Sequence, residues 1–196
     1  NFNTNCNKTY IYNNTENTFD NWLQIAYNYK YQVCTQYICD TLNHLVLNYY
    51  SNILPQNNNY RWRIEQAKAT NKNILKLYSE HNIIPVIKPT QNNNNELFWN
   101  TGLQNLLKQN NWLAIGSNFP ANTNNSIQNY HNSLTPDKIK GQNKKNAKQQ
   151  QKLSRVQALK AMTIWAARAQ FDENNKGSIE TGKLADFFIT NYDIVT

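Results

Sequence analysis

The side chains best suited to chemistry are few in this sequence and widely spaced. It has three histidines, His44, His81 and His131, and no two of them stand at i, i+4 or as His-x-His. A zinc site takes imidazole, thiolate or carboxylate ligands, and a catalytic site leaves one position open for water. The histidines alone therefore do not predict a metal centre. We expect His44 to be a half-exposed packing residue on a helix, His81 to lie at a helix end that favours a cation, and His131 to lie in a polar loop.

Nucleophilic side chains are equally isolated. Ser117 follows a glycine, but the G-x-S-x-G frame of a nucleophile elbow is absent. Cys6, Cys34 and Cys39 are odd in number and lack C-x-x-C spacing, so a disulfide framework is not expected. We interpret the cysteines as small buried thiols of a protein in a reducing compartment.

Two kinds of pattern alternate along most of the chain, and they set where these side chains lie. Helical periodicity predicts helices at residues 18–29, 41–54, 71–81 and 97–110, and β-rich runs predict strands at 31–38, 60–66, 83–88 and 112–117. This alternation predicts an α/β fold, with parallel strands and helices packed outside them. Residues 1–17 are polar and predict an irregular arm or a surface strand.

The last forty or so residues form a different pattern. Small and apolar residues at i, i+3 and i+4 predict a helix over 156–171. A short extended piece at 178–180 then leads to a turn at 181–183, where Gly182 is free to take positive φ. Residues 184–190, with Phe187 and Phe188 adjacent, predict a strand.

This C-terminal string resembles the carboxyl-terminal signature of the amidohydrolase superfamily of metal-dependent hydrolases, and within it the N-substituted formamide deformylase-like, amidohydrolase-3 branch. The matching residues are Gly177, Ser178, Ile179, Glu180, Gly182, Lys183, Ala185, Asp186 and Asp193. Four earlier segments, 35–40, 63–68, 85–91 and 116–120, continue the resemblance, which covers residues 20 to 196.

The resemblance implies the carboxyl-terminal half of a (β/α)8 barrel, strands five to eight, plus part of a small β-sandwich domain. The domains would be an arm at 1–17, the half-barrel at 18–171 and the sandwich return at 172–196. Because such a barrel closes only with eight strands, the other half is expected from a longer protein or from another chain. The open edges of strands 31–38 and 112–117 are then expected to pair with polypeptide outside this sequence.

The positions that hold metal in the family carry amides here. Where the family has histidines after strands five and six and an aspartate after strand eight, this sequence has Gln36, Gln66 and Asn118. The strand-seven position has likewise become Gln91. An amide is a neutral, weak zinc ligand and cannot accept a proton at neutral pH. The resemblance implies an ancestral zinc or other divalent metal, and these four residues imply that it has been lost.

Two carboxylates, Asp40 and Glu65, do occupy their family positions. With Arg61 and Arg63 close in sequence, we interpret them as members of structural ion pairs at the strand ends. The alternative is a rebuilt hydrolytic site that uses Asp40, Glu65 or residues outside this sequence.

The formal net charge is +8, which permits nucleic-acid partners. The one concentrated basic run, residues 138–152, has no aromatic residues to stack on bases, so we interpret it as a solvated loop or frayed helix. The sequence has no apolar stretch of membrane-spanning length. Cysteine usage indicates an intracellular protein, and the basic charge and AT-rich codon usage favour the mitochondrion.

The sequence therefore predicts a catalytically inactive, amidohydrolase-like protein that serves as a structural or interaction subunit of a larger assembly, with other protein chains as partners. Two alternatives stay open. One is an active metal-dependent hydrolase of C–N (amide) bonds with a rebuilt site, and the other is an RNA-contacting subunit of a ribonucleoprotein.

Overall fold

The computed structural model describes residues 3–10, 16–36, 40–67, 72–89, 103–117, 125–134 and 152–195. Five parallel strands form one sheet in the order β1-β2-β3-β4-β5. They are β1 (Asn3–Tyr10), β2 (Tyr31–Gln36), β3 (Arg63–Glu65), β4 (Ile84–Ile87) and β5 (Ala114–Ile115). The α/β architecture with a parallel sheet is thus confirmed.

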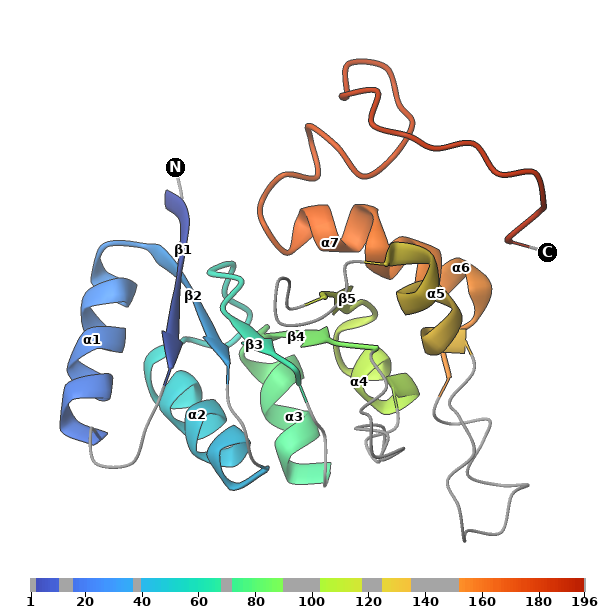
Figure 1. Ribbon diagram of the computed structural model, residues 1–196. Helices are drawn as coiled ribbons and strands as arrows, with labels where there is room; N and C mark the ends of the chain where they lie inside the picture. Colours follow the sequence, from blue (N-terminus) through green and yellow to red (C-terminus); the bar gives the residue numbers. More distant parts are fainter. Residues whose placement is uncertain are drawn as a thin grey trace, which may run out of the picture.

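Four helices connect these strands and lie side by side along one face of the sheet (Figure 1). They are α1 (Glu16–Asn28), α2 (Asp40–Ile53), α3 (Lys72–Glu80) and α4 (Leu103–Asn110). Three further helices follow β5: α5 (Ser126–Leu134), α6 (Arg155–Met162) and α7 (Ile164–Arg168). Among the described residues, every helix is too short or too polar to cross a bilayer.

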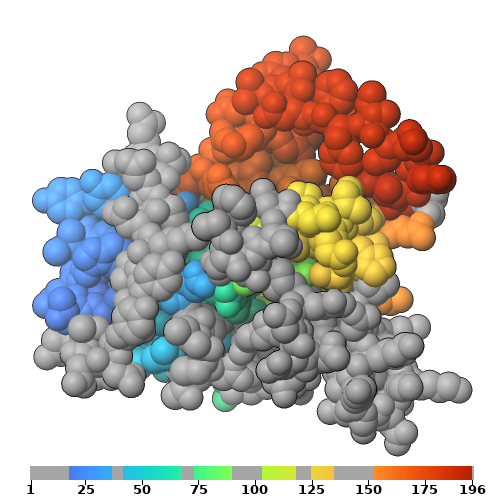
Figure 2. Space-filling view, in the orientation of Figure 1, coloured from blue at the N-terminus to red at the C-terminus, as the bar shows by residue number. Residues whose placement is uncertain are grey.

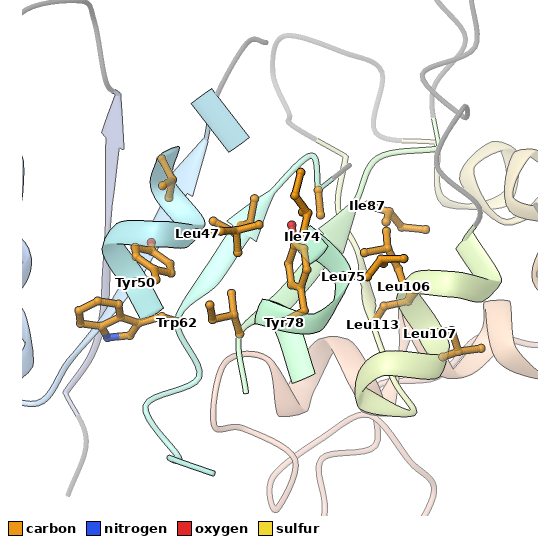
Figure 3. Close-up of a cluster of buried hydrophobic side chains, with 14 of the residues drawn as sticks. Leu47, Tyr50, Trp62, Ile74, Leu75, Tyr78, Ile87, Leu106, Leu107 and Leu113 are labelled. Atoms are coloured by element: carbon orange, nitrogen blue, oxygen red, sulfur yellow. The ribbon is translucent and has the colours of Figure 1, made fainter. Parts of the chain in front are cut away.

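The main core lies between the sheet and the helices α1 to α4. Figure 3 shows its centre, where Leu47 and Tyr50 of α2, Trp62 before β3 and Tyr78 of α3 interdigitate. Trp62 is fully buried, stacks edge-on against Tyr50 at a centroid distance of 4.8 Å, and donates its indole N–H to the Tyr31 carbonyl at 2.9 Å. The aliphatic side chains of the strands and the apolar stripes of the helices meet here, so burial of this face holds the layers together.

The opposite face of the sheet carries a smaller apolar cluster under α7. Ala169, at the end of α7, packs against four apolar residues of the sheet. They are Ile84 and Val86 of β4, Trp112 just before β5 and Ala114 in β5. Gln32 of β2 and Arg63 of β3 both donate to the Ala169 carbonyl, at 2.8 and 3.1 Å. The chain after β5 therefore returns across the sheet and is fixed to its other face by apolar and polar contacts.

Four details differ from the sequence prediction. Residues 3–10 pair with β2, so the edge of residues 31–38 predicted to be open is covered from within this chain. The helix α5 was predicted as loop, and His131 lies in it. The helix predicted over 156–171 is broken at Thr163, whose φ and ψ are −119° and −100°. Residues 184–190 form no strand, because no neighbouring strand among the described residues offers them a ladder.

A buried hydroxyl pair makes the core sensitive to alkaline pH. The Thr35 and Tyr50 hydroxyls lie 2.6 Å apart, and both residues are fully buried. Burial raises the pKa of the Tyr50 hydroxyl well above its ordinary value of 10.0. Above pH 10 the unfolded chain ionises at this residue while the folded protein keeps the proton, so stability contributed by Tyr50 is present below that pH and lost above it.

We therefore expect the wild-type free energy of unfolding to fall with pH above 10 more steeply than that of Tyr50→Phe, by about 1.4 kcal/mol per pH unit. At neutral pH the free energy of unfolding of Tyr50→Phe should already be about 1–3 kcal/mol lower than that of wild type, because the Thr35 hydroxyl stays buried without its partner. Urea unfolding at pH 8 and pH 11 measures both effects. Parallel pH dependence of the two proteins would contradict the assignment.

Candidate functional site

The carboxyl ends of the parallel strands bring the predicted site residues to one edge of the sheet. In the register of the ladder, Gln36 at the end of β2 lies beside Glu65 at the end of β3, and Glu65 lies beside Val86 of β4. Residues paired in this way point to the same face of a sheet. Gln36 and Glu65 therefore project together from adjacent strands.

Gln66 reaches the same place through an unusual backbone conformation. It follows β3 directly and has φ of 59°, the left-handed region that costs a non-glycine residue about 1–2 kcal/mol. A hydrogen bond from the N–H of the next residue, Ala67, to the Val86 carbonyl at 2.9 Å stabilises this strained conformation. The turn sets the position of the Gln66 side chain at the strand end.

These residues line a pocket of about 40 Å³, which we call the strand-end pocket. Its walls come from the ends of β2 to β5: Gln36, Glu65, Gln66, Val86, Ile87, Lys88 and Gly116. A Cβ placed on Gly116 would lie 3.3 Å from Val86 Cγ1, so the absence of a side chain there helps to leave the space open. The volume accommodates about three water molecules.

Among the described residues that line the pocket, one carboxylate and one ammonium group carry charge. Glu65 Oε1 lies 3.2 Å from Arg63 Nε, so its charge is balanced by an ion pair on its own strand. Lys88 follows β4 and is half-buried, and burial lowers the pKa of its ammonium group. The structure shows no ion pair or hydrogen bond from the Lys88 side chain to another described residue.

The structure thus brings together two of the four residues that the sequence singled out. Gln36 and Gln66 both line the strand-end pocket, whereas Gln91 and Asn118 lie outside the described residues. The predicted ion pair of Glu65 with Arg63 is present, but Arg61 pairs with Glu173 instead. The side chain of Asp40, like most of the basic run at 138–152, is not among those described.

The three histidines and Cys34 are not among the residues that line this pocket. His44 is exposed on α2, and His81 Nδ1 lies 2.7 Å from the Leu54 carbonyl oxygen at the far end of the strands. In the part of the chain that the structure describes, no three His, Cys, Asp or Glu side chains gather as a metal site would require. Cys34 is fully buried and disulfide-bonded, so its interpretation as a free thiol is wrong and cysteine usage no longer indicates a reducing compartment.

Sequence reasoning missed Lys88 and Gly116. Both follow predicted strands directly, and the rule that parallel strands present their carboxyl ends together would have placed them beside Gln36 and Gln66. Neither residue belongs to a metal-binding motif, so the motifs of the sequence do not point to them.

A second, larger cavity lies where the C-terminal segment, residues 172–195, passes over α6 and α7. It measures about 530 Å³, and its apolar lining includes Leu159, Met162, Ala166, Phe187 and Phe188. Figure 2 shows the C-terminal segment in orange and red as a ridge beside the rest of the molecule. Its charged lining residues are Lys176 and Asp186, and it has no described lining residue in common with the strand-end pocket.

Comparison with known proteins agrees with this architecture. A family model described as amidohydrolase family matches residues 8–196. A metal-dependent hydrolase of Pyrococcus furiosus superposes with a TM-score of 0.70 at 16% identity, over 92% of this chain and 37% of its own. A metal-dependent hydrolase of Pyrococcus horikoshii OT3 gives 0.72 at 17% identity, over 91% of this chain and 38% of its own.

An adenosine deaminase of Xanthomonas campestris with bound zinc superposes with a TM-score of 0.57 at 18% identity, over 87% of this chain and 39% of its own. No curated protein matches the chain significantly. The chain spans less than two fifths of the length of these solved structures. At such identities the superpositions show a shared fold, and the family match, which covers nearly the whole sequence, shows that this chain belongs to the amidohydrolase family.

Proposed function

We propose that this chain is a catalytically inactive member of the amidohydrolase family that serves as a structural or interaction subunit of a larger assembly. The observation that carries the proposal is the chemistry of the strand-end pocket. Two of its polar groups are the amides of Gln36 and Gln66, and its cation is Lys88. In the family resemblance these strand ends hold a divalent metal.

The described residues of this pocket do not fit such a metal. Amide oxygens are weak, neutral zinc ligands, and the one carboxylate, Glu65, is already paired with Arg63. A divalent cation would also lie close to the ammonium of Lys88, and like charges in a partly buried site repel strongly. The same donor set offers no imidazole to act as a general base. This donor set supports the proposed loss of the metal site.

The arrangement of the strands and the exposed apolar side chains of the C-terminal segment support the proposed structural role. We infer that the chain forms the carboxyl-terminal half of a barrel, and that polypeptide outside this sequence completes the sheet beyond β1 and β5. The five described strands are parallel and need eight for closure. The C-terminal segment presents large apolar side chains to solvent, among them Ile179, Ile189 and Tyr192, which are 90%, 87% and 84% exposed. Apolar groups gathered on one segment in this way mark an interaction surface.

Zinc binding tests the loss of the site. We expect the wild-type chain, dialysed against zinc and then buffer, to retain no stoichiometric zinc and to hydrolyse no simple amides or esters. Gln66→His alone should also bind no zinc, because one imidazole cannot hold the ion against water. Even the combined Gln36→His, Gln66→His and Asn118→Asp variant should bind weakly, since metal affinity also needs partners that orient the ligands. Elemental analysis gives the zinc content, and tight binding by Gln66→His alone would overturn the proposal.

The association state tests the structural role. Expressed alone, the chain should self-associate or aggregate, and a soluble, stoichiometric complex should form when a polypeptide that completes the sheet is supplied. Light scattering after size-exclusion chromatography measures the mass. A monomeric chain that stays soluble and unfolds cooperatively by itself would contradict the half-barrel arrangement.

A further inference from the structure

The strand-end pocket keeps a positive charge. Lys88 is part of its wall, and no ion pair to another described residue balances the charge of its ammonium group. Glu65 is the other charged side chain among the described residues of the wall, and Arg63 neutralises it at 3.2 Å. Among the described side chains, the pocket and this supporting pair therefore carry a net charge of +1.

The remaining polar groups on the wall supply hydrogen-bond donors. Gln36 and Gln66 line the pocket from adjacent strand ends, and a glutamine side-chain amide carries one acceptor oxygen and an NH2 group with two donors. Val86 and Ile87 form the apolar part of the wall, which excludes water and strengthens electrostatic interactions within. Gly116 leaves the space that a side chain would narrow.

We propose that the strand-end pocket binds a small carboxylate, with Lys88 as its counter-ion and the amides of Gln36 and Gln66 as hydrogen-bond donors. An ammonium group and two amides can together satisfy the two oxygens of a carboxylate, and charge-assisted hydrogen bonds of this kind are the strong ones. The pocket's volume of about 40 Å³ suits a planar group of a few atoms better than a tetrahedral dianion. This inference rests on the part of the proposed function that removes the metal from the site.

Acetate is the probe for this site in the wild-type protein, studied with its partner if it is isolated in complex. The reactivity of Lys88 towards reductive methylation, followed by peptide mass spectrometry, should fall saturably as acetate is added. Lys76, whose side chain is 71% exposed on α3, is the internal control and should react at a constant rate. Chloride at equal ionic strength should protect neither lysine, and sulfate should protect Lys88 less than acetate does.

Calorimetric titration with acetate extends the test to variants. Lys88→Met, which keeps the length of the side chain and removes its charge, should bind acetate at least about tenfold more weakly than wild type. Lys76→Met should bind as wild type does. Equal protection of Lys88 and Lys76, or equal acetate affinity of wild type and Lys88→Met, would overturn the inference. Stoichiometric zinc binding that Gln66→Ala abolishes would instead overturn the proposed function, so the two failures are distinguishable.

Discussion

Gly177→Ala is expected to lower the free energy of unfolding of the C-terminal segment by about 2–5 kcal/mol, the sum of backbone strain and overpacking. Gly177 has φ of +94°, and a Cβ there would lie 2.8 Å from Ile164 Cα and 2.9 Å from Ala167 Cβ. Both neighbours belong to α7, so the clash cannot be relieved by rotating a side chain. Hydrogen exchange of residues 172–195 should accelerate, and the melting temperature should fall.

Gly182 provides the matched control for that variant. Its φ of +90° is nearly the same, but a Cβ there meets nothing within 4 Å. Gly182→Ala should therefore show the backbone term alone, about 1–2 kcal/mol. The difference between the losses in free energy of unfolding of the two variants gives the cost of the clash between residue 177 and α7. Equal losses would show that the approach is absent in solution.

Arg61→Ala is the second change with a large expected effect. It should lower the free energy of unfolding by about 3–5 kcal/mol, because it removes one partner of a buried ion pair. Arg61 donates to both carboxylate oxygens of Glu173, at 2.9 and 2.7 Å, and to the Arg168 carbonyl at 2.6 Å. Its guanidinium also lies 4.1 Å from the centroid of the Phe171 ring. The side chains of the pair are only 12% and 25% exposed. Chemical denaturation measures the loss.

Lys76→Ala is the control for Arg61→Ala. The Lys76–Glu80 pair is an i, i+4 contact on the surface of α3, and its removal should cost about 0.3–0.5 kcal/mol. Acid adds an independent check. Burial alone would raise the pKa of Glu173, but the hydrogen bonds and charge of Arg61, together with a backbone hydrogen bond and the charge of Arg168, hold that pKa below its ordinary value of 4.5.

The stability that Glu173 contributes is accordingly present above pH 4.5 and is lost as the pH falls through its lowered value. In Arg61→Ala this acid-dependent component should disappear. If both proteins lose stability equally below pH 4.5, the ion pair does not tie the C-terminal segment to the sheet.

The fold and half of the candidate site were predictable because their signals are local. Aliphatic runs alternating with amphipathic helices specify a parallel sheet, and that topology alone brings Gln36 and Gln66 to one edge. For residues 1–17 the sequence predicted either an irregular arm or a surface strand. It could not decide between them, because the asparagine-rich stretch has low β propensity and the strand at 3–10 forms by pairing with β2.

The prediction failed where tertiary context decides the outcome. Residues 184–190 have strand propensity but no neighbour among the described residues, and propensity without a ladder does not make a strand. The sequence of α5, SIQNYHNSL, contains four residues that favour caps and turns, yet Tyr130 and Asn132 are buried and hold it as a helix. The break at Thr163 leaves no mark in the apolar spacing, because α6 and α7 share one continuous pattern.

The contacts of the Ala169 carbonyl also bear on the order in which the protein can be built. Its donors, Gln32 and Arg63, lie 137 and 106 positions earlier in the chain. A nascent chain on the ribosome can assemble its strands and outer helices from nearby segments, but it cannot cover the other face of the sheet until α7 and Ala169 have emerged. Contacts between such distant positions form slowly, because loop-closure entropy is lost before they stabilise anything. Until then Ile84, Val86 and Trp112 face water, and that interval is when a partner or a chaperone has access to this face.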